Sequence, residues 1–85
     1  MEATAKCYVY VLRSQDLPRR YYVGLTSNVT QRLIDHNEGC LPNTARYRPW
    51  QLSVVVEFAD DLRAVNFERY LKSGSGRAFA RKHFE

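Results

Sequence analysis

The sequence has few of the residues that build disulfide frameworks or metal clusters. Its 85 residues include two cysteines, Cys7 and Cys40, and two histidines. Because structural zinc usually takes four close-spaced ligands, this supply excludes a zinc-organised fold. We expect both cysteines to be reduced packing residues, since intracellular chains rarely hold disulfides.

Long apolar runs are missing as well. No segment approaches the roughly 20 apolar residues of a membrane-spanning helix, and the N-terminal residues lack the apolar stretch of a signal peptide. Internal repeats, low-complexity tracts and interdomain linkers are also absent. We therefore expect a single domain over residues 1–85, with its core at about 7–84, in a cytoplasmic, nucleoid-associated protein that has no membrane partner.

The chain is instead rich in apolar residues and positive charge. Apolar residues make up 45% of it, which is ample for a packed core and argues against disorder. The formal net charge is +4 at pH 7, and clustered cations favour nucleic acid because they neutralise phosphates. We predict that DNA is contacted by two basic groups, in the middle and towards the C-terminal end of the chain: Arg46 and Arg48, and Lys72, Arg77, Arg81 and Lys82.

The first half of the chain predicts a hairpin followed by a helix. Residues 7–13 and 21–26 are β-branched and aromatic, and their short connection predicts an antiparallel pair. Asn28 with Gln31 fits a capping box, so we expect a helix from about residue 29 to 38. Gly39 stands where a left-handed helix end belongs, and residues 39–49 predict a loop.

The second half predicts one strand and two helices. Residues 50–58 form the third strand, and their run of valines predicts a central position covered on both faces. A helix capped by Asp60 or Asp61 follows, and Ser73 to Gly76 ends it and caps a final helix at about 77–84. The fold class is α/β (α+β), a three-stranded, mainly antiparallel sheet flanked by helices in the order β-β-α-β-α-α.

Two tyrosines of the hairpin are candidate functional residues. Side chains alternate along a strand, so a suitable register places Tyr10 and Tyr22 on the same face. Gly24 leaves open space beside them for a ligand or another backbone. Cross-strand aromatic packing is the structural alternative.

The helices supply three more candidates. Arg32 and His36 are four residues apart and project from the same side of the first helix, whose buried side we predict from Val29, Leu33 and Ile34. Glu68 shares a face of the next helix with three apolar residues: Ala64, Phe67 and Leu71. A solvated polar face for the pair and an exposed margin for the carboxylate are the structural alternatives.

The order and spacing of these residues resemble the GIY-YIG nuclease family. The first triplet is Tyr8-Val9-Tyr10 and the second is Tyr22-Val23-Gly24, and the resemblance covers about residues 7–84. Tyr8 and Val9 replace the Gly and Ile of the family's first triplet. The Asn that many members carry in the last segment has no counterpart here, where Ser73 or Ser75 is the available oxygen.

The resemblance implies a small, stand-alone member of bacterial type with the GIY-YIG endonuclease fold. Such a protein is a metal-dependent endonuclease that hydrolyses phosphodiester bonds in DNA, with low sequence specificity and a preference for structured substrates in repair or recombination. The residues that match the family's catalytic positions are Tyr10, Tyr22, Arg32, His36 and Glu68.

The resemblance also implies a role for each residue. Glu68 would hold one Mg²⁺ or Mn²⁺, Arg32 would pair with phosphate oxygens, and His36 would hydrogen-bond the phosphate or assist proton movement. Tyr10, oriented with the help of Tyr22, would be the general base. Its pKa of about 10 would then have to fall to about 8 beside Arg32 or the metal, which predicts cleavage that rises into the alkaline range.

Two other functions remain open from the sequence. A catalytically inactive GIY-YIG-fold nucleic-acid-binding domain would bind DNA without metal-dependent nicking. A protein-interaction module that uses exposed aromatic residues would bind its partner at high salt, where phosphate-driven binding fails. For an active nuclease, a homodimer or a partner protein would supply specificity or the second cut.

Overall fold

β-Branched and aromatic residues form the three strands of the sheet. The computed structural model describes residues 6–17 and 20–85, with β1 at Cys7–Ser14, β2 at Tyr21–Thr26 and β3 at Trp50–Phe58. Both pairings are antiparallel, and the strand order is β2-β1-β3. The predicted strand bounds are confirmed to within one residue.

β1 lies at the centre of the sheet, so the prediction that the third strand is central is wrong. Val9, Tyr10, Val11 and Leu12 are each no more than 2% exposed, whereas Val55 in β3 is 39% exposed. A β-branched side chain also suits a strand with one half-covered face, so consecutive valines do not require burial on both sides.

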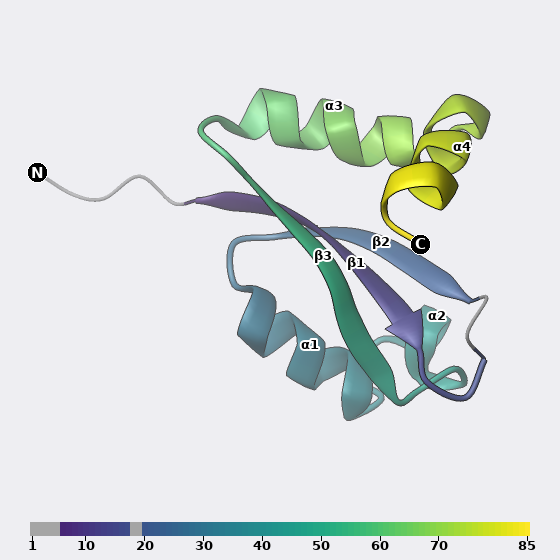
Figure 1. The fold of residues 1–85 in the computed structure, drawn as a ribbon. Helices are drawn as coiled ribbons and strands as arrows, with labels where there is room; N and C mark the ends of the chain where they lie inside the picture. The colour runs from purple at the N-terminus through teal and green to yellow at the C-terminus, as the bar shows by residue number, and fades with distance from the viewer. Residues whose placement is uncertain (1–5, 18–19) are drawn as a thin grey trace, which may run out of the picture.

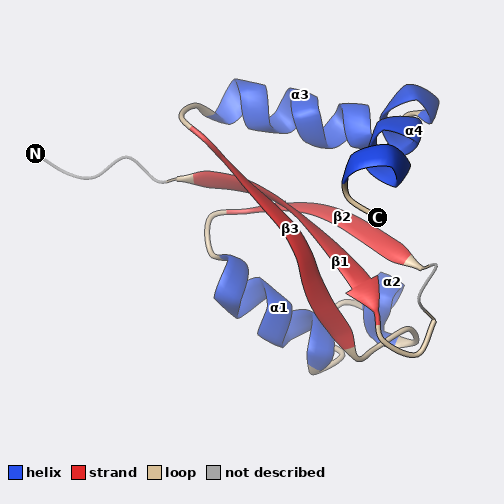
Figure 2. Cartoon of the chain, in the orientation of Figure 1, coloured by secondary structure: helices blue, strands red, loops and turns tan. Residues whose placement is uncertain are grey.

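In the part of the chain that the structure describes, four helices cover the two faces of the sheet. They are α1 (Val29–Asn37), α2 (Pro42–Ala45), α3 (Asp61–Leu71) and α4 (Gly74–His83). Figure 1 shows α3 and α4 on one side of the sheet and α1 and α2 on the other, and Figure 2 shows the same three layers. The predicted fold class is confirmed, with α2 as an additional short helix in the predicted loop.

Side-chain caps begin three of the helices. The Oδ1 atoms of Asn28 and Asp60 accept from backbone N–H groups three residues later, at 3.0 and 2.8 Å. Ser73 caps α4 in the same way through Gly76, so α4 begins three residues before the predicted start. The Gln31 side chain bonds Asp35, so only half of the predicted capping box forms.

The helix end at Gly39 and the start of β3 both depend on local hydrogen bonding and backbone conformation. Gly39 has a φ of 79°, which confirms the predicted left-handed position. The Asn37 side chain then connects α1 to β3, because its Nδ2 donates to the Trp50 carbonyl and its Oδ1 accepts from the Trp50 N–H.

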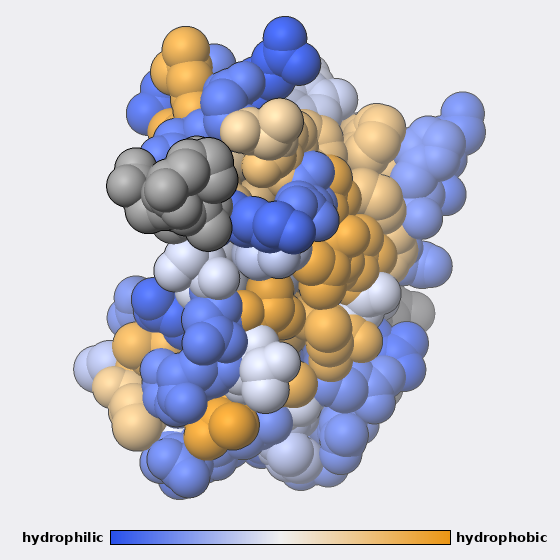
Figure 3. Space-filling model, turned by 90° about the vertical axis from the view of Figure 1, so that its left-hand side faces the viewer, coloured by the Kyte–Doolittle hydropathy of each residue, from blue (hydrophilic) through white to orange (hydrophobic). Residues whose placement is uncertain are grey.

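The face of the sheet under α3 and α4 is an apolar core. Val9, Val11, Ala64, Leu71 and Ala80 are buried together there. On the side of the molecule seen in Figure 3, apolar surface is concentrated in the middle, with mostly hydrophilic surface around it.

The two cysteines are both free. Cys7 is half-buried and packs against the apolar core, as predicted, whereas Cys40 is exposed and is not a packing residue. Across residues 6–17 and 20–85, none of the helices combines the length and the apolar character needed to cross a bilayer.

Candidate active site

Tyr10 and Tyr22 lie on the same face of the hairpin, as predicted. The register pairs Tyr10 with Gly24 and Leu12 with Tyr22, which makes the two tyrosines diagonal neighbours. Their ring centroids are 6.3 Å apart. Tyr10 is 2% exposed and belongs to a second buried cluster, with Leu12 and Trp50, on the α1 side of the sheet.

Gly24 holds space for Tyr10 itself. A Cβ atom at position 24 would collide with the ring and the hydroxyl group of Tyr10. The prediction of open space for a ligand or another backbone is therefore wrong, because the Tyr10 side chain fills it and lies directly against the backbone of β2. Any side chain at this position would displace Tyr10.

α1 turns its polar pair towards the sheet. His36 is fully buried, Arg32 is half-buried, and Ile34 is 42% exposed. The prediction that Ile34 belongs to the buried side is therefore wrong, and a solvated Arg32–His36 face is excluded. The hydroxyl of Tyr10 supplies the hydrogen bond that makes a buried imidazole acceptable in this layer.

A directional hydrogen-bond chain runs from Tyr10 into α2. The Tyr10 hydroxyl lies 2.8 Å from Nε2 of His36, and Nδ1 of His36 lies 2.7 Å from Oγ1 of Thr44. The single hydroxyl hydrogen of Thr44 is donated to the Leu41 carbonyl at 3.3 Å. With that hydrogen on the Leu41 carbonyl, Thr44 accepts from Nδ1–H, an arrangement in which Nε2 is the acceptor for Tyr10.

Burial decides the proton affinities of this pair. Burial, and then the neighbouring Tyr22, raises the pKa of Tyr10 and outweighs the opposing effect of Arg32. Burial raises the pKa of Tyr10 by more than Arg32 lowers it. The prediction of a net lowering beside Arg32 is therefore wrong for the groups of this chain. Burial, followed by Arg32, lowers the pKa of His36, so its imidazole is neutral at pH 7.

Glu68 reaches the same site from α3. Its side chain is 19% exposed and forms an ion pair with Lys72. Lys72 Nζ also lies 5.8 Å from the centroid of the Tyr22 ring. Tyr22, Arg32 and Glu68 all act electrostatically on Tyr10, so three of the predicted catalytic side chains influence its pKa.

Glu68 is the residue that could hold a metal ion. In residues 6–17 and 20–85, no group of three or more His, Cys, Asp or Glu side chains is arranged to hold one. A lone, partly exposed carboxylate suits a hard divalent cation that keeps water and takes substrate oxygens as its other ligands. The Lys72 ammonium pairs with this carboxylate, so a metal cation would have to displace it.

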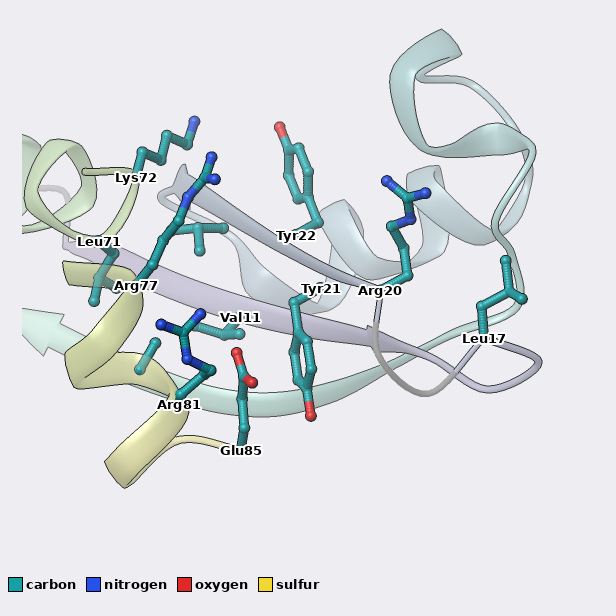
Figure 4. A pocket seen from close by; sticks show the side chains of 12 residues that line it. Val11, Leu17, Arg20, Tyr21, Tyr22, Leu71, Lys72, Arg77, Arg81 and Glu85 are labelled. Atoms are coloured by element: carbon teal, nitrogen blue, oxygen red, sulfur yellow. The ribbon is translucent and has the colours of Figure 1, made fainter. Parts of the chain in front are cut away.

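The predicted basic residues fall in two places. Lys72, Arg77 and Arg81 line a groove between β2 and the α3–α4 corner, while Lys82 is exposed outside its lining (Figure 4). Arg46 and Arg48 lie after α2. No contact of the structure tests their binding to DNA, which stays a prediction.

Tyr47 organises the α2 end of the molecule. Its ring carries the guanidinium groups of Arg20 and Arg46, at 4.1 and 5.4 Å from the centroid. Arg48 instead packs its guanidinium against Gly39. Because Arg20 also lines the groove by β2, it joins the two basic regions.

Sequence reasoning missed two residues of the site. Asp35 of α1 acts on both Tyr10 and His36, in the direction that raises each pKa. Thr44 is 2% exposed and holds His36. The local sequence signal for Thr44 was Leu41-Pro42, because Pro suits the first turn of a helix and Thr44 lies in the helix that starts there, α2.

Of the two serines proposed in place of the family's Asn, Ser73 uses its hydroxyl in hydrogen bonds away from the site. Ser73 donates to the Tyr70 carbonyl and accepts from Gly76 N–H, so its hydroxyl serves the α3–α4 corner. Ser75 is exposed in the first turn of α4.

Known proteins are similar to this chain in sequence. Structure-specific endonuclease subunit SLX1 homologues from Drosophila ananassae and Giardia intestinalis are 41% and 36% identical over 71% and 73% of this chain, and cover 23% and 18% of their own lengths. The subunit slx1 of Aspergillus fumigatus is 38% identical over 84% of the chain and 20% of its own length. The chain thus spans about a fifth of the length of these curated relatives.

A solved structure and a family profile agree with this similarity. The NMR structure of a UPF0213 protein from Bacillus halodurans is 28% identical and has a TM-score of 0.55, over 91% of this chain and 81% of that one. The profile of the GIY-YIG catalytic domain matches residues 6–82. Because this profile covers most of the chain, the chain belongs to the GIY-YIG catalytic domain family.

Proposed function

We propose that this chain is a metal-dependent endonuclease that hydrolyses phosphodiester bonds in DNA and selects its substrate by shape more than by base sequence. The observation that carries this proposal is the buried Tyr10–His36 hydrogen bond beside Arg32 and Glu68. The curated relatives are named as structure-specific endonuclease subunits, which supports activity on structured DNA. DNA repair or recombination is the setting that we propose.

Tyr10 and His36 move the proton of the attacking water in this mechanism. The Tyr10 hydroxyl accepts a proton from water while it donates its own to Nε2 of His36, so no free phenolate has to form. The raised pKa of Tyr10 keeps the phenol protonated, and the lowered pKa of His36 keeps the acceptor nitrogen available. As the water oxygen bonds to phosphorus, the bond to the leaving oxygen breaks and that oxygen takes a proton from solvent.

The other residues hold and neutralise the phosphate. Arg32 pairs with its non-bridging oxygens, and the Tyr22 hydroxyl positions it. Glu68 would hold Mg²⁺ or Mn²⁺ once Lys72 has left the carboxylate. Such an ion, when bound, supplies Lewis-acid stabilisation of the phosphoryl charge. Lys72 is then available to pair with a phosphate.

Nicking of supercoiled plasmid with Mg²⁺ or Mn²⁺ tests this function. Glu68→Gln is expected to slow nicking by at least about 100-fold, because the charged group that would hold the cation is removed. Glu57→Gln is the matched control: it makes the same change on the exposed side of β3, where Glu57 pairs with Lys6. Equal nicking by wild type and Glu68→Gln would contradict the proposal.

A non-catalytic nucleic-acid-binding domain is the second candidate. The ion pair between Lys72 and Glu68 favours it, because it neutralises the carboxylate that would hold a metal. This reading predicts equal DNA binding by wild type and Glu68→Gln, with no metal-dependent nicking of linear, nicked or branched substrates by either protein.

One site of this kind makes one cut. Double-strand cleavage would therefore need a second copy of the chain or a partner protein, and the relatives' description as subunits favours the partner. Sedimentation velocity at concentrations that support nicking is expected to give a monomer. A stable dimer under those conditions would favour the second copy instead.

A further inference from the structure

A groove runs beside the candidate active site, along the free edge of β2. Its volume is about 1210 Å³, above the roughly 300–1,000 Å³ typical of small-molecule pockets, so it suits an extended ligand. Figure 4 shows Lys72, Arg77 and Arg81 on one side of it and Tyr21 and Tyr22 opposite them. We call it the β2 groove.

The rim of the β2 groove is cationic. Arg20, Lys72, Arg77 and Arg81 line it, and Glu85 is the one acidic residue in the lining. The ion pairs of residues 6–17 and 20–85 engage Lys72 but none of these arginines. The rim therefore offers guanidinium groups to an incoming polyanion, and phosphates are the complementary ligand.

The floor of the β2 groove is aromatic and apolar. Tyr21 is half-buried and packs, with Val23 and Leu71, against the apolar core under α3 and α4. A DNA duplex stacks its bases inside and presents phosphates and sugars to a protein surface, so it has little use for such a floor. An unpaired strand exposes its bases, which stack on aromatic side chains while cations hold its backbone.

The β2 groove adjoins the candidate active site. Tyr21 and Tyr22 are consecutive and point to opposite faces of the sheet, so the groove wraps around the β2 edge. Tyr22 and Lys72 belong both to its lining and to the candidate active site. A strand bound in the groove thus passes directly beside Tyr22 and the Glu68–Lys72 pair.

We propose that the β2 groove binds an unpaired, single-stranded segment of the nucleic acid next to the phosphate that is cut. This proposal deepens the proposed nuclease function and rests on it, because the position beside a cut phosphate has a function only if the chain is a nuclease. It makes the substrate class a DNA with a single-stranded arm or gap. The binding itself is measurable without any cleavage.

Fluorescence anisotropy with a labelled oligo-dT strand and a duplex of equal length, both in EDTA, tests the proposal. Arg81→Gln in the groove and Arg63→Gln in α3, outside it, each remove one positive charge from an exposed arginine. Arg81→Gln is expected to reduce the log–log salt slope for the single strand by about 0.7, and Arg63→Gln to leave that slope unchanged. Equal changes for both variants would overturn the proposal.

Tyr21→Leu tests the floor of the groove while it keeps an apolar side chain in the core. We expect it to weaken binding of the single strand at least about fivefold, because one stacked base is lost, and to leave duplex binding unchanged. Thermal melts of each variant separate lost binding from lost folding. An equal loss for strand and duplex, or no loss for the strand, would overturn the proposal.

The two proposals fail in distinguishable ways. Wild-type protein that binds the single strand through Arg81 and Tyr21 but never nicks DNA refutes the nuclease and keeps the groove. Nicking that depends on Glu68 but proceeds at the wild-type rate in Tyr21→Leu, on a substrate with a single-stranded arm, keeps the nuclease and refutes the groove.

Discussion

The two faces of the sheet are both buried, but by different chemistry. Under α3 and α4 the buried side chains are apolar, with Val9 at 1% and Leu71 at 2% exposure. Under α1 and α2 the buried set includes His36 and Thr44, which need hydrogen bonds to be there. Among the described residues, every buried side-chain polar atom has a partner. The first face serves stability, and the second holds hydrogen-bonded polar groups in fixed positions at a cost in desolvation.

The largest expected effect comes from the polar face. His36→Gln removes the nitrogen that accepts the Tyr10 proton, so nicking should fall by about 10²–10⁴-fold. Initial nicking rates under the conditions of the Glu68 experiment measure the loss. A rate within about threefold of wild type would show that the Tyr10–His36 bond has no part in the chemistry.

The apolar face should show the opposite pattern. Val9→Ala removes two buried methyl groups on the α3 side of β1 and should cost about 2 kcal/mol in the free energy of unfolding. For a domain of this size that lowers Tm by roughly 8–16 °C. Below the transition, nicking per folded molecule should equal that of wild type, and a large loss of rate would erase the difference between the faces.

Thr44 is expected to act through His36 with a smaller effect. Thr44→Val keeps the shape but leaves Nδ1–H without an acceptor, and nicking should fall about tenfold because the neutral imidazole loses its preferred tautomer. Thr44→Ser should restore the rate. Nitrogen-15 shifts of His36 report the tautomer directly: wild type should have an unprotonated Nε2, and the same tautomer in Thr44→Val would contradict this role.

The smallest effect is a pH dependence of stability. Because the pKa of His36 is lowered in the fold, the unfolded chain takes up its proton first, at about pH 6.5. This contribution is complete above that pH and is lost as pH falls through 6.5 towards the lower folded value. The drop in Tm between pH 7.5 and 5.5 should be smaller in His36→Gln than in wild type.

The same shifts change the expected pH profile of cleavage. A phenolate base would make the rate climb into the alkaline range, whereas a protonated Tyr10 that donates to neutral His36 predicts a plateau from neutral pH upward and a loss in acid. Nicking rates between pH 5.5 and 9 discriminate between the two, and a continued rise above pH 8 would restore the phenolate.

Local sequence signals were sufficient for the elements of the fold. The strand bounds, the Asn28 and Asp60 caps and the left-handed Gly39 depend on neighbours within a few residues, and all are confirmed. The family resemblance selected His36, which bonds Tyr10, and Tyr22, Arg32 and Glu68, which influence the pKa of Tyr10. Their catalytic roles stay predictions.

Long-range packing set the features that the sequence did not predict. Helical periodicity placed Ile34 inside, but the hydroxyl of Tyr10 makes His36 the better buried residue. The role of Thr44 could not be predicted, because it depends on the packing of α2 against His36. The direction of the Tyr10 pKa also required the structure, because burial and a nearby guanidinium act on it in opposite senses.

Asn37 has a consequence for self-association. β3 is an edge strand, and an open edge offers N–H and C=O groups to which a strand of another molecule can add. At Trp50 the amide of Asn37 already satisfies both groups, and a bulge follows where Val11 pairs with Val54 but Leu12 pairs with Leu52. We therefore expect the Asn37 side chain and the bulge to hinder the addition of a strand from another molecule to the edge of β3.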